Sequence, residues 1–385
     1  MAMASQIDVF HECFDQVEDP RVAGRTTHPL NSILFLVVSA VIAGADGPDE
    51  IESFGDEKLD WLSKYADFEA GIPSHDTITR VLSLIKPAEF QKALLQWHAH
   101  LCEMNWDHEI KDDDHPVHVA IDGKTVRGSY TDAEKSDAIH IVSAWATENG
   151  VALGQTEVDS KSNEITAIPE LLELIDISNA IVTLDAMGCQ KSIAEKIIDE
   201  GGDYVFAVKD NHPKLCAAIA EHFEMAHNEG LTTHGVRSTT TKGKQAGRDE
   251  ERFYATGPIP ESLRALTDQW KGAKSICQAN TCTSRGDKQT SDIRYYISSR
   301  PARVGEFANS ARRHWGIESM HWVLDVVFHE DSSRLRTKNA TSNMSFTRRF
   351  VTTLLKRDTR KKSLRRKRKI AGWNTAFLEK LLFAA

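Results

Sequence analysis

The chain has 385 residues, of which 41% are hydrophobic and 27% are charged, and its formal net charge at pH 7 is −9. These proportions are ordinary for a soluble globular protein with a large core, and they exclude a disordered or fibrous chain. The charge is unevenly placed, because residues 294–385 carry 21 Lys and Arg against 7 Asp and Glu. A basic region on an acidic protein can still bind a polyanion, since the local potential governs the encounter.

The cysteines and the apolar segments indicate the compartment. None of the six cysteines belongs to a CxxC pair, which argues against a structural zinc site or a disulfide framework. The longest apolar run, residues 33–45, is too short to cross a bilayer and lies too far along the chain for a signal peptide. We therefore expect a cytoplasmic protein without a membrane partner.

The first 110 residues predict a helical domain. Apolar residues recur at helical spacing in three segments, at 30–44, 49–65 and 87–104. Between them, "PSHDTITRVL" (73–82) begins with capping residues and continues with an apolar helical face. We interpret this segment as a candidate DNA-recognition helix that exposes His75, Thr77 and Arg80.

An α/β pattern follows the polar segment "KDDDHP" (111–116). In chain order we predict strands at 117–122, 140–147 and 151–160, a helix at 164–175, a strand at 180–186, a helix at 190–200, a strand at 203–209 and a helix at 213–229. The dipeptide Asn149-Gly150 between the second and third strands is a strong hairpin signal. This order predicts a mixed sheet with helices packed on its faces.

The last part of the chain contains an interruption and a basic run. Thr-, Gly- and Lys-rich turns with isolated β runs indicate an inserted β-rich region at about 230–292, followed by a strand at 294–299 and a long helix at 303–328. We interpret residues 356–385 as a basic C-terminal tail, because ten of the fourteen residues in 356–369 are Lys or Arg. Such a run attracts a phosphate backbone.

Three acids stand where they could meet. Asp122 and Asp185 each end a predicted strand, and functional groups in open α/β sheets gather outside strand ends. Glu318 lies among apolar residues of the long helix, where an unpaired charge would be costly. Three carboxylates suit Mg²⁺, and two such ions about 4 Å apart activate a hydroxyl and stabilise a leaving oxygen of a phosphodiester. A lone strand-end Asp, however, usually only caps the next turn.

Several blocks of the chain resemble those of the H-repeat-associated transposases, bacterial insertion-sequence enzymes of the DDE transposase superfamily. In chain order these blocks are "PSHDTITRVL", "AIDGKTVRGS", "LDAMGCQ", "DYVFAVKDNH", "HWGIESMHWVLDVVFHED" and "KRKIAGWN". The similarity runs from about residue 10 to the end, and the blocks follow that family's order. The resemblance implies an RNase H-like α/β catalytic domain at 116–355 after a helical DNA-binding domain at 1–110. It also implies metal-dependent DNA cleavage and strand transfer at the element's ends, with Asp122, Asp185 and Glu318 as the catalytic triad.

The same resemblance implies the cofactors and partners. Two Mg²⁺ or Mn²⁺ ions are expected at the triad. Double-stranded DNA is the expected partner, both at the transposon ends and at the target, bound by a homodimer in the bacterial nucleoid. The candidate phosphate contacts are Lys124, Arg127, Lys209, Arg248, Arg252, Arg313, Arg365, Arg366, Lys367 and Arg368.

The sequence departs from the wider superfamily around the last acid, where an Arg and a Lys normally stand at fixed spacings. Arg313 precedes Glu318 by five residues instead of four, and His314 occupies the expected place. Asp325 replaces the Lys and lies two helical turns beyond Glu318 on the same face. It either assists the metal site or pairs with a nearby Arg, and we favour the pairing. The usual Lys-Gly-Asn-Gln turn reads Lys209-Asp-Asn-His212.

Two other functions were weighed. A DNA-binding protein derived from a transposase that no longer transposes is the main alternative, although the presence of all three acids argues against lost chemistry. A phosphotransferase with Asp122 as nucleophile is disfavoured, because it would need a second Asp at the position that Lys124 occupies.

Overall fold

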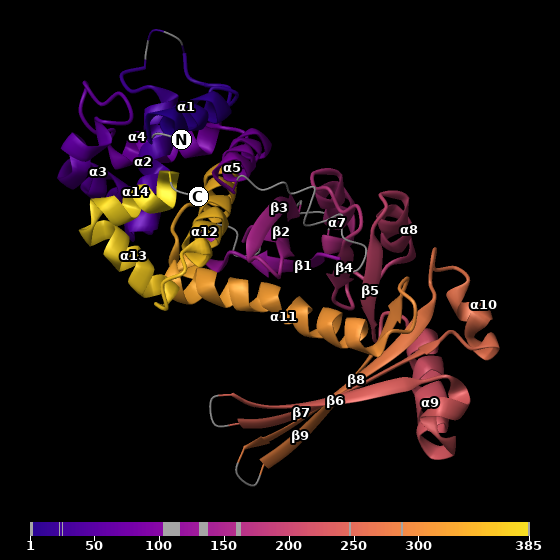
Figure 1. Ribbon diagram of the computed structural model, residues 1–385. Helices are drawn as coiled ribbons and strands as arrows, with labels where there is room; N and C mark the ends of the chain where they lie inside the picture. The colour runs from indigo at the N-terminus through magenta and orange to yellow at the C-terminus, as the bar shows by residue number, and fades with distance from the viewer. Residues whose placement is uncertain are drawn as a thin grey trace.

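The structure is a computed structural model that describes residues 3–22, 24, 26–102, 116–130, 138–158, 163–245, 248–285 and 288–383. A helical module lies at one end, a β-sheet in the middle, and long β-ribbons with helices beside them at the other end (Figure 1). One long helix, α11 (Val304–Val327), runs beneath the sheet from the ribbons to the helical module (Figure 1). The predicted boundary at 111–116 falls almost wholly outside the described residues.

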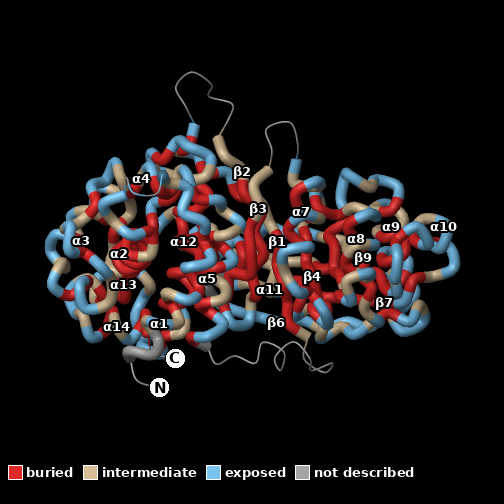
Figure 2. Tube along the Cα trace, turned by 90° about the horizontal axis from the view of Figure 1, so that it is seen from above, coloured by how far each residue is buried: buried red, intermediate tan, exposed pale blue. Residues whose placement is uncertain are grey.

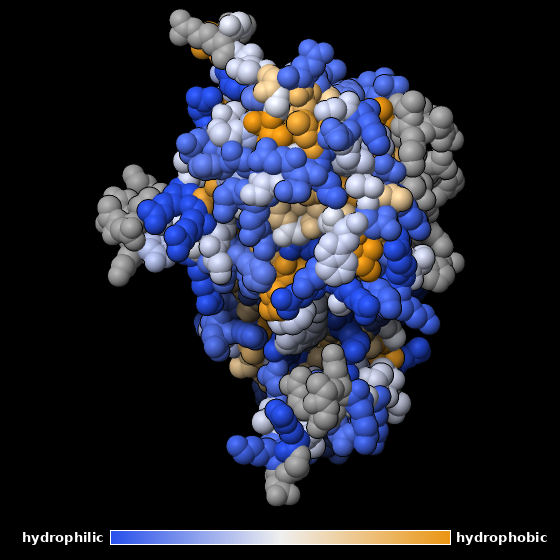
Figure 3. All heavy atoms as spheres, turned by 90° about the vertical axis from the view of Figure 1, so that its left-hand side faces the viewer, coloured by the Kyte–Doolittle hydropathy of each residue, from blue (hydrophilic) through white to orange (hydrophobic). Residues whose placement is uncertain are grey.

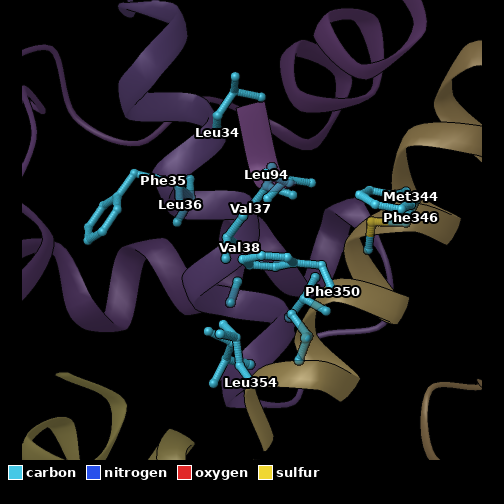
Figure 4. Close-up of a cluster of buried hydrophobic side chains, with 14 of the residues drawn as sticks. Leu34, Phe35, Leu36, Val37, Val38, Leu94, Met344, Phe346, Phe350 and Leu354 are labelled. Atoms are coloured by element: carbon cyan, nitrogen blue, oxygen red, sulfur yellow. The ribbon is translucent and has the colours of Figure 1, made fainter. Parts of the chain in front are cut away.

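The helical module is built around an almost fully buried helix. Its N-terminal elements are α1 (Met3–Phe14), α2 (Leu30–Ala43), α3 (Pro48–Leu62), α4 (His75–Leu84) and α5 (Pro87–Cys102). Helix α2 is apolar on every side and is buried along nearly its whole length, as expected for a helix at the centre of a bundle. Figure 4 shows Val37 and Val38 of α2 beside Phe350 and Leu354 of α12, within one hydrophobic cluster.

The C-terminal segment completes this module, so the prediction of a basic tail at 356–385 is wrong. It forms α12 (Lys338–Arg357), α13 (Leu364–Trp373) and α14 (Thr375–Phe383). Apolar residues of α14 enter the same core as α2, among them Phe377 and Leu382. The carboxylate of Glu379 accepts hydrogen bonds from the indole of Trp61 and the hydroxyl of Tyr65. The two ends of the chain therefore fold as one unit, whose outer face is mostly hydrophilic (Figure 3).

The central sheet has the RNase H-like order. Its strands are β1 (His118–Thr125), β2 (His140–Ala146), β3 (Val151–Val158), β4 (Ile181–Leu184) and β5 (Asp203–Val208). They lie in the order β3-β2-β1-β4-β5, with β2 antiparallel to its neighbours and β4 parallel to β1 and β5. Helices α7 (Glu164–Glu173), α8 (Lys191–Asp199) and α9 (Pro213–Glu229) share one hydrophobic core with this sheet. Figure 2 shows buried residues along β1, β4 and α12 in the middle of the molecule.

The inserted β-rich region extends this sheet instead of forming a separate unit. It consists of β6 (Arg237–Gln245), β7 (Arg248–Pro258), β8 (Ser275–Arg285) and β9 (Lys288–Ser298), with α10 (Arg264–Thr267) between β7 and β8. Strand β9 pairs antiparallel with β5, so one sheet of nine strands results. The predicted strand at 294–299 is the end of β9, and the ribbons project past α11 (Figure 1).

Helix α11 (Val304–Val327) buries aliphatic residues and exposes two tryptophans. Ile317, Met320 and Leu324 are fully buried, whereas Trp315 is 44% exposed and Trp322 is 60% exposed. The tryptophans therefore line the solvent side of the helix.

In the described part of the chain no single helix is long and apolar enough to span a membrane, although α2 and α3, bent by 96°, pass that test as a pair.

Candidate active site

Asp122 lies near the end of β1, on the sheet face that α11 covers. Residues alternate between the two faces of a strand; Ile121 packs into the core beneath α7, and Lys124 contacts Asp325 of α11. The Asp122 carboxylate is 3.5 Å from Nδ1 of His321 on α11. A Cβ atom on the next residue, Gly123, would overlap the carboxylate of Glu164, so a larger residue there would displace that side chain.

Asp185 follows β4 directly and caps the turn after it. Its Oδ1 accepts hydrogen bonds from the backbone N–H groups of Met187 (2.9 Å) and Gly188 (3.1 Å). The Lys209–His212 turn holds this loop in place, because Asn211 donates to the carbonyl of Ala186. The unusual turn therefore has a defined role in fixing the backbone beside Asp185.

Glu318 is exposed on α11 and faces the same cavity as Asp185. This cavity has a volume of about 190 Å³, and Lys209 and Arg294 also line it. Nδ1 of His314, one helical turn before Glu318, lies 3.0 Å from Oγ1 of Thr183 on β4. That contact ties α11 to the strand that carries Asp185.

The charges of the other two acids act on Asp122. Burial raises the pKa of Asp122 to about 7, and the negative charges of Asp185, Glu164 and Glu318 add to this rise. Surrounding protein atoms also raise the pKa of Glu318, while Arg294 opposes the shift. Throughout the described residues, however, no group of three His, Cys, Asp or Glu side chains is close enough to hold a metal ion. The acids fit a hard cation by charge and by donor atom, but a cation would have to draw them together.

Some of the predicted cations are exposed or partly exposed. Arg127 is exposed on the short helix after β1, and its guanidinium is 3.6 Å from Asp331. Arg252 and Arg313 line a second cavity of about 610 Å³ between α11 and the ribbons, where each also pairs with a Glu. The side chain of Arg248 lies outside the described residues.

Other predicted cations bind groups of the protein itself. Lys124 is 8% exposed and surrounded by three carboxylates, so its predicted phosphate contact is wrong. Lys367 and Arg368 are each 4% exposed and donate to backbone carbonyls of the helical module. Neither is available to DNA. Arg365 and Arg366, on the outer face of α13, are exposed.

Sequence reasoning missed Arg294, Glu164 and His321. Arg294 on β9 lies over the ring of Trp315 at 4.8 Å and lines both cavities. No local motif marks Arg294 or Glu164, because only the sheet topology brings them near the acids. His321 could have been found, since it stands three residues after Glu318 and therefore on the same helical side.

The raised pKa of Asp122 gives a pH prediction for the metal-free protein. The folded state keeps a proton on Asp122 up to about pH 7, whereas the unfolded chain releases it near pH 4. Stability is therefore lost as pH rises from 4 to 7, by a few kcal/mol at most. We expect Asp122→Asn to raise the melting temperature in EDTA, by more at pH 8 than at pH 5. Thermal unfolding at both values checks this, and a difference independent of pH would contradict it.

Comparison with known proteins decides the family. The model of the "Transposase DDE domain" family matches residues 113–354, and that of the "DDE_Tnp_1-associated" family matches residues 11–98. The chain belongs to the DDE transposases. Putative transposase YncI of Escherichia coli O157:H7 is 44% identical over 372 residues, covering 95% of this chain and 92% of the relative. The H repeat-associated putative transposase YhhI of Escherichia coli K12 is 41% identical and covers 95% of each chain.

Among solved structures, the chain is similar to one in a piggyBac transposase synaptic complex with hairpin DNA. The match covers 99% of this chain and 82% of the piggyBac chain. Its TM-score is 0.41 and its sequence identity 11%. That likeness is too distant to bear on the geometry of this DDE transposase.

Proposed function

We propose that this protein cleaves DNA at the ends of an insertion sequence and transfers the freed strand to target DNA. Asp122, Asp185 and Glu318 would hold two Mg²⁺ or Mn²⁺ ions. The observation that carries the proposal is the cavity that Asp185 and Glu318 line together, with Asp122 on the neighbouring strand beside the same helix, α11. The charges of Asp185 and Glu318 add to the rise that burial causes in the pKa of Asp122. Carboxylates that repel one another are stabilised by a divalent cation, which supplies the missing positive charge.

The chemistry follows from what surrounds these acids. The bound ions would activate the attacking hydroxyl and stabilise the leaving oxygen. Lys209 and Arg294, which line the cavity with Asp185 and Glu318, are placed to bind the phosphate under attack. Burial lowers the pKa of His314 to about 4. His314 is therefore neutral at physiological pH and contributes its contact with Thr183 instead of a charge.

The larger cavity is a suitable path for the DNA next to the cut. It lies between α11 and the ribbons and shares Arg294 and Trp315 with the smaller cavity. Arginines contact phosphates, and an exposed tryptophan can stack on an unpaired base. The helical module would bind the DNA farther from the cut.

A basic surface on α13 supports DNA contact by that module. Five exposed cations form it: Lys361, Lys362, Arg365, Arg366 and Lys369. Within the described chain no ion pair engages these five. We expect the double change Arg365→Gln with Arg366→Gln to weaken DNA binding about tenfold and to reduce the slope of log affinity against log salt by about 2.

A filter-binding titration at several salt concentrations measures this. The matched control removes Lys196 and Lys271 in the same way. These residues pair with acids near α8, far from α13 (Figure 1). An equal loss in both double variants would show a general charge effect and contradict a specific surface.

The proposed activity is tested by incubating the protein with Mg²⁺ or Mn²⁺ and supercoiled DNA that carries the element's ends. Nicking that needs the metal and stops with EDTA is the expected result. Tight binding to the ends without nicking would instead favour a DNA-binding protein that no longer transposes. Crosslinking on DNA tests the proposed homodimer.

A further inference from the structure

Side chains of α11 bind side chains of β1 at two points, one on each side of Asp122 and Glu318. Near its start, Oγ of Ser310 lies 2.9 Å from Nε2 of His118. Near its end, Asp325 lies 2.8 Å from Nζ of Lys124. The strand and the helix thus run side by side in the same direction.

The spacing of these contacts matches along the two elements. The six residue steps from His118 to Lys124 span about 20 Å at the strand rise. The fifteen residue steps from Ser310 to Asp325 span about 22 Å at the helical rise. Asp122 then lies about 13 Å along its element, and Glu318 about 12 Å along its own. The two contacts therefore hold Asp122 and Glu318 at similar positions along β1 and α11.

The second contact, between Lys124 and Asp325, is the more constrained, because a buried ionic network surrounds it. Lys124 also contacts Asp331 (2.9 Å) and Glu330 (3.5 Å), and the latter is completely buried. Glu330 in turn lies 3.5 Å from Arg349 of α12. The ammonium of Lys124 is therefore held from several sides and cannot follow Asp325 if α11 shifts.

We propose that Lys124 and Asp325 are positioning residues whose ion pair sets the separation of Asp122 and Glu318. This rests on the proposed function of the two acids. It resolves the two roles open to Asp325: the residue pairs with a cation, and this cation is Lys124 instead of an Arg. The loss of the pair frees the end of α11 and moves Glu318 away from Asp122.

The test measures Mn²⁺ binding by electron paramagnetic resonance without DNA, and Mg²⁺-dependent nicking beside it. Asp325→Asn keeps the shape and removes the charge, while Lys124 retains two carboxylates that support folding. We expect its Mn²⁺ affinity to fall about tenfold, as is usual when groups that orient metal ligands are removed. Its affinity for DNA in EDTA should stay unchanged.

Two matched variants separate this from a general loss of charge. Asp331→Asn removes another partner of Lys124 that does not lie on α11, and Asp199→Asn breaks a surface pair with Lys271. Both should bind Mn²⁺ like the wild type. Wild-type affinity in Asp325→Asn, or an equal loss in Asp331→Asn, would overturn the proposal. If the wild-type protein neither binds Mn²⁺ nor nicks DNA, the result would instead contradict the proposed function.

If Asp325→Asn does not fold, Asp325→Glu decides. It keeps a carboxylate beside Lys124 and leaves Glu330 and Asp331 with their cation. We expect a folded protein with Mn²⁺ affinity within about threefold of the wild type. A folded Asp325→Glu variant whose Mn²⁺ affinity falls about tenfold or more would contradict the ion pair as the device that positions the acids.

Discussion

Replacing Asp185 with Asn should slow DNA cleavage by at least about 10²-fold, equivalent to ~3 kcal/mol of activation barrier. The substitution removes one of the charges that would hold the metal ions. It keeps the turn, because an Asn Oδ1 can still accept the hydrogen bonds from Met187 and Gly188. Folding and DNA binding should therefore survive. Rates of nicking under single-turnover conditions measure the effect.

The control for this change is Asp176→Asn. Asp176 caps the loop before β4 in the same manner, since its Oδ1 accepts a hydrogen bond from the backbone N–H of Ser178 at 2.9 Å. It is exposed and lies away from the two cavities beside α11. We expect wild-type cleavage from this variant. If Asp185→Asn cleaves as fast as Asp176→Asn, Asp185 only caps its turn.

The second large effect is on stability. Glu330→Gln should lower the free energy of unfolding by about 3–5 kcal/mol, the usual cost of leaving buried charges without their partner. Glu330 is fully buried, and Ser345 donates a hydrogen bond to it while Arg348 and Arg349 lie within 3.8 Å. Burial raises the pKa of Glu330, but these arginines outweigh it and hold the pKa below its usual value. Both guanidiniums would then lose the carboxylate that lies within 3.8 Å of them.

Urea unfolding followed by circular dichroism measures this change. Glu173→Gln is the matched control, because Glu173 forms an exposed ion pair with Lys196. Such a pair contributes less than about 1 kcal/mol. A loss of under about 1 kcal/mol in Glu330→Gln would mean that the network between β1, α11 and α12 does not hold these elements together.

Local patterns were enough to predict the order of elements in the catalytic domain. The strand β4 and the helices α8 and α9 fall within a few residues of their predictions, because turn residues and apolar periodicity mark their ends. The resemblance to transposases named Asp122, Asp185 and Glu318, and in the structure Asp185 and Glu318 line one cavity while burial and their charges raise the pKa of Asp122. Their convergence depends on strand order, which no single segment encodes.

The failed predictions share a physical cause. The charges of the basic run dominate its composition and predict a solvated tail, yet α13 and α14 each bury residues within the helical module. Arg368 is buried because its guanidinium satisfies carbonyl groups at the ends of α2 and α11. Packing between distant segments decides which cation contacts a backbone carbonyl and which cation is exposed to solvent. The same holds for Lys124, whose carboxylate partners lie about 200 residues away along the chain.

The most direct measurement is a crystal structure of the protein with Mn²⁺, with anomalous scattering used to locate the ions. The proposed site predicts manganese peaks within about 2.2 Å of carboxylate oxygens of Asp122 and Asp185, with Glu318 drawn toward one of them. Manganese elsewhere, or none beside these acids at saturating concentration, would contradict the central claim that the three carboxylates form one metal site.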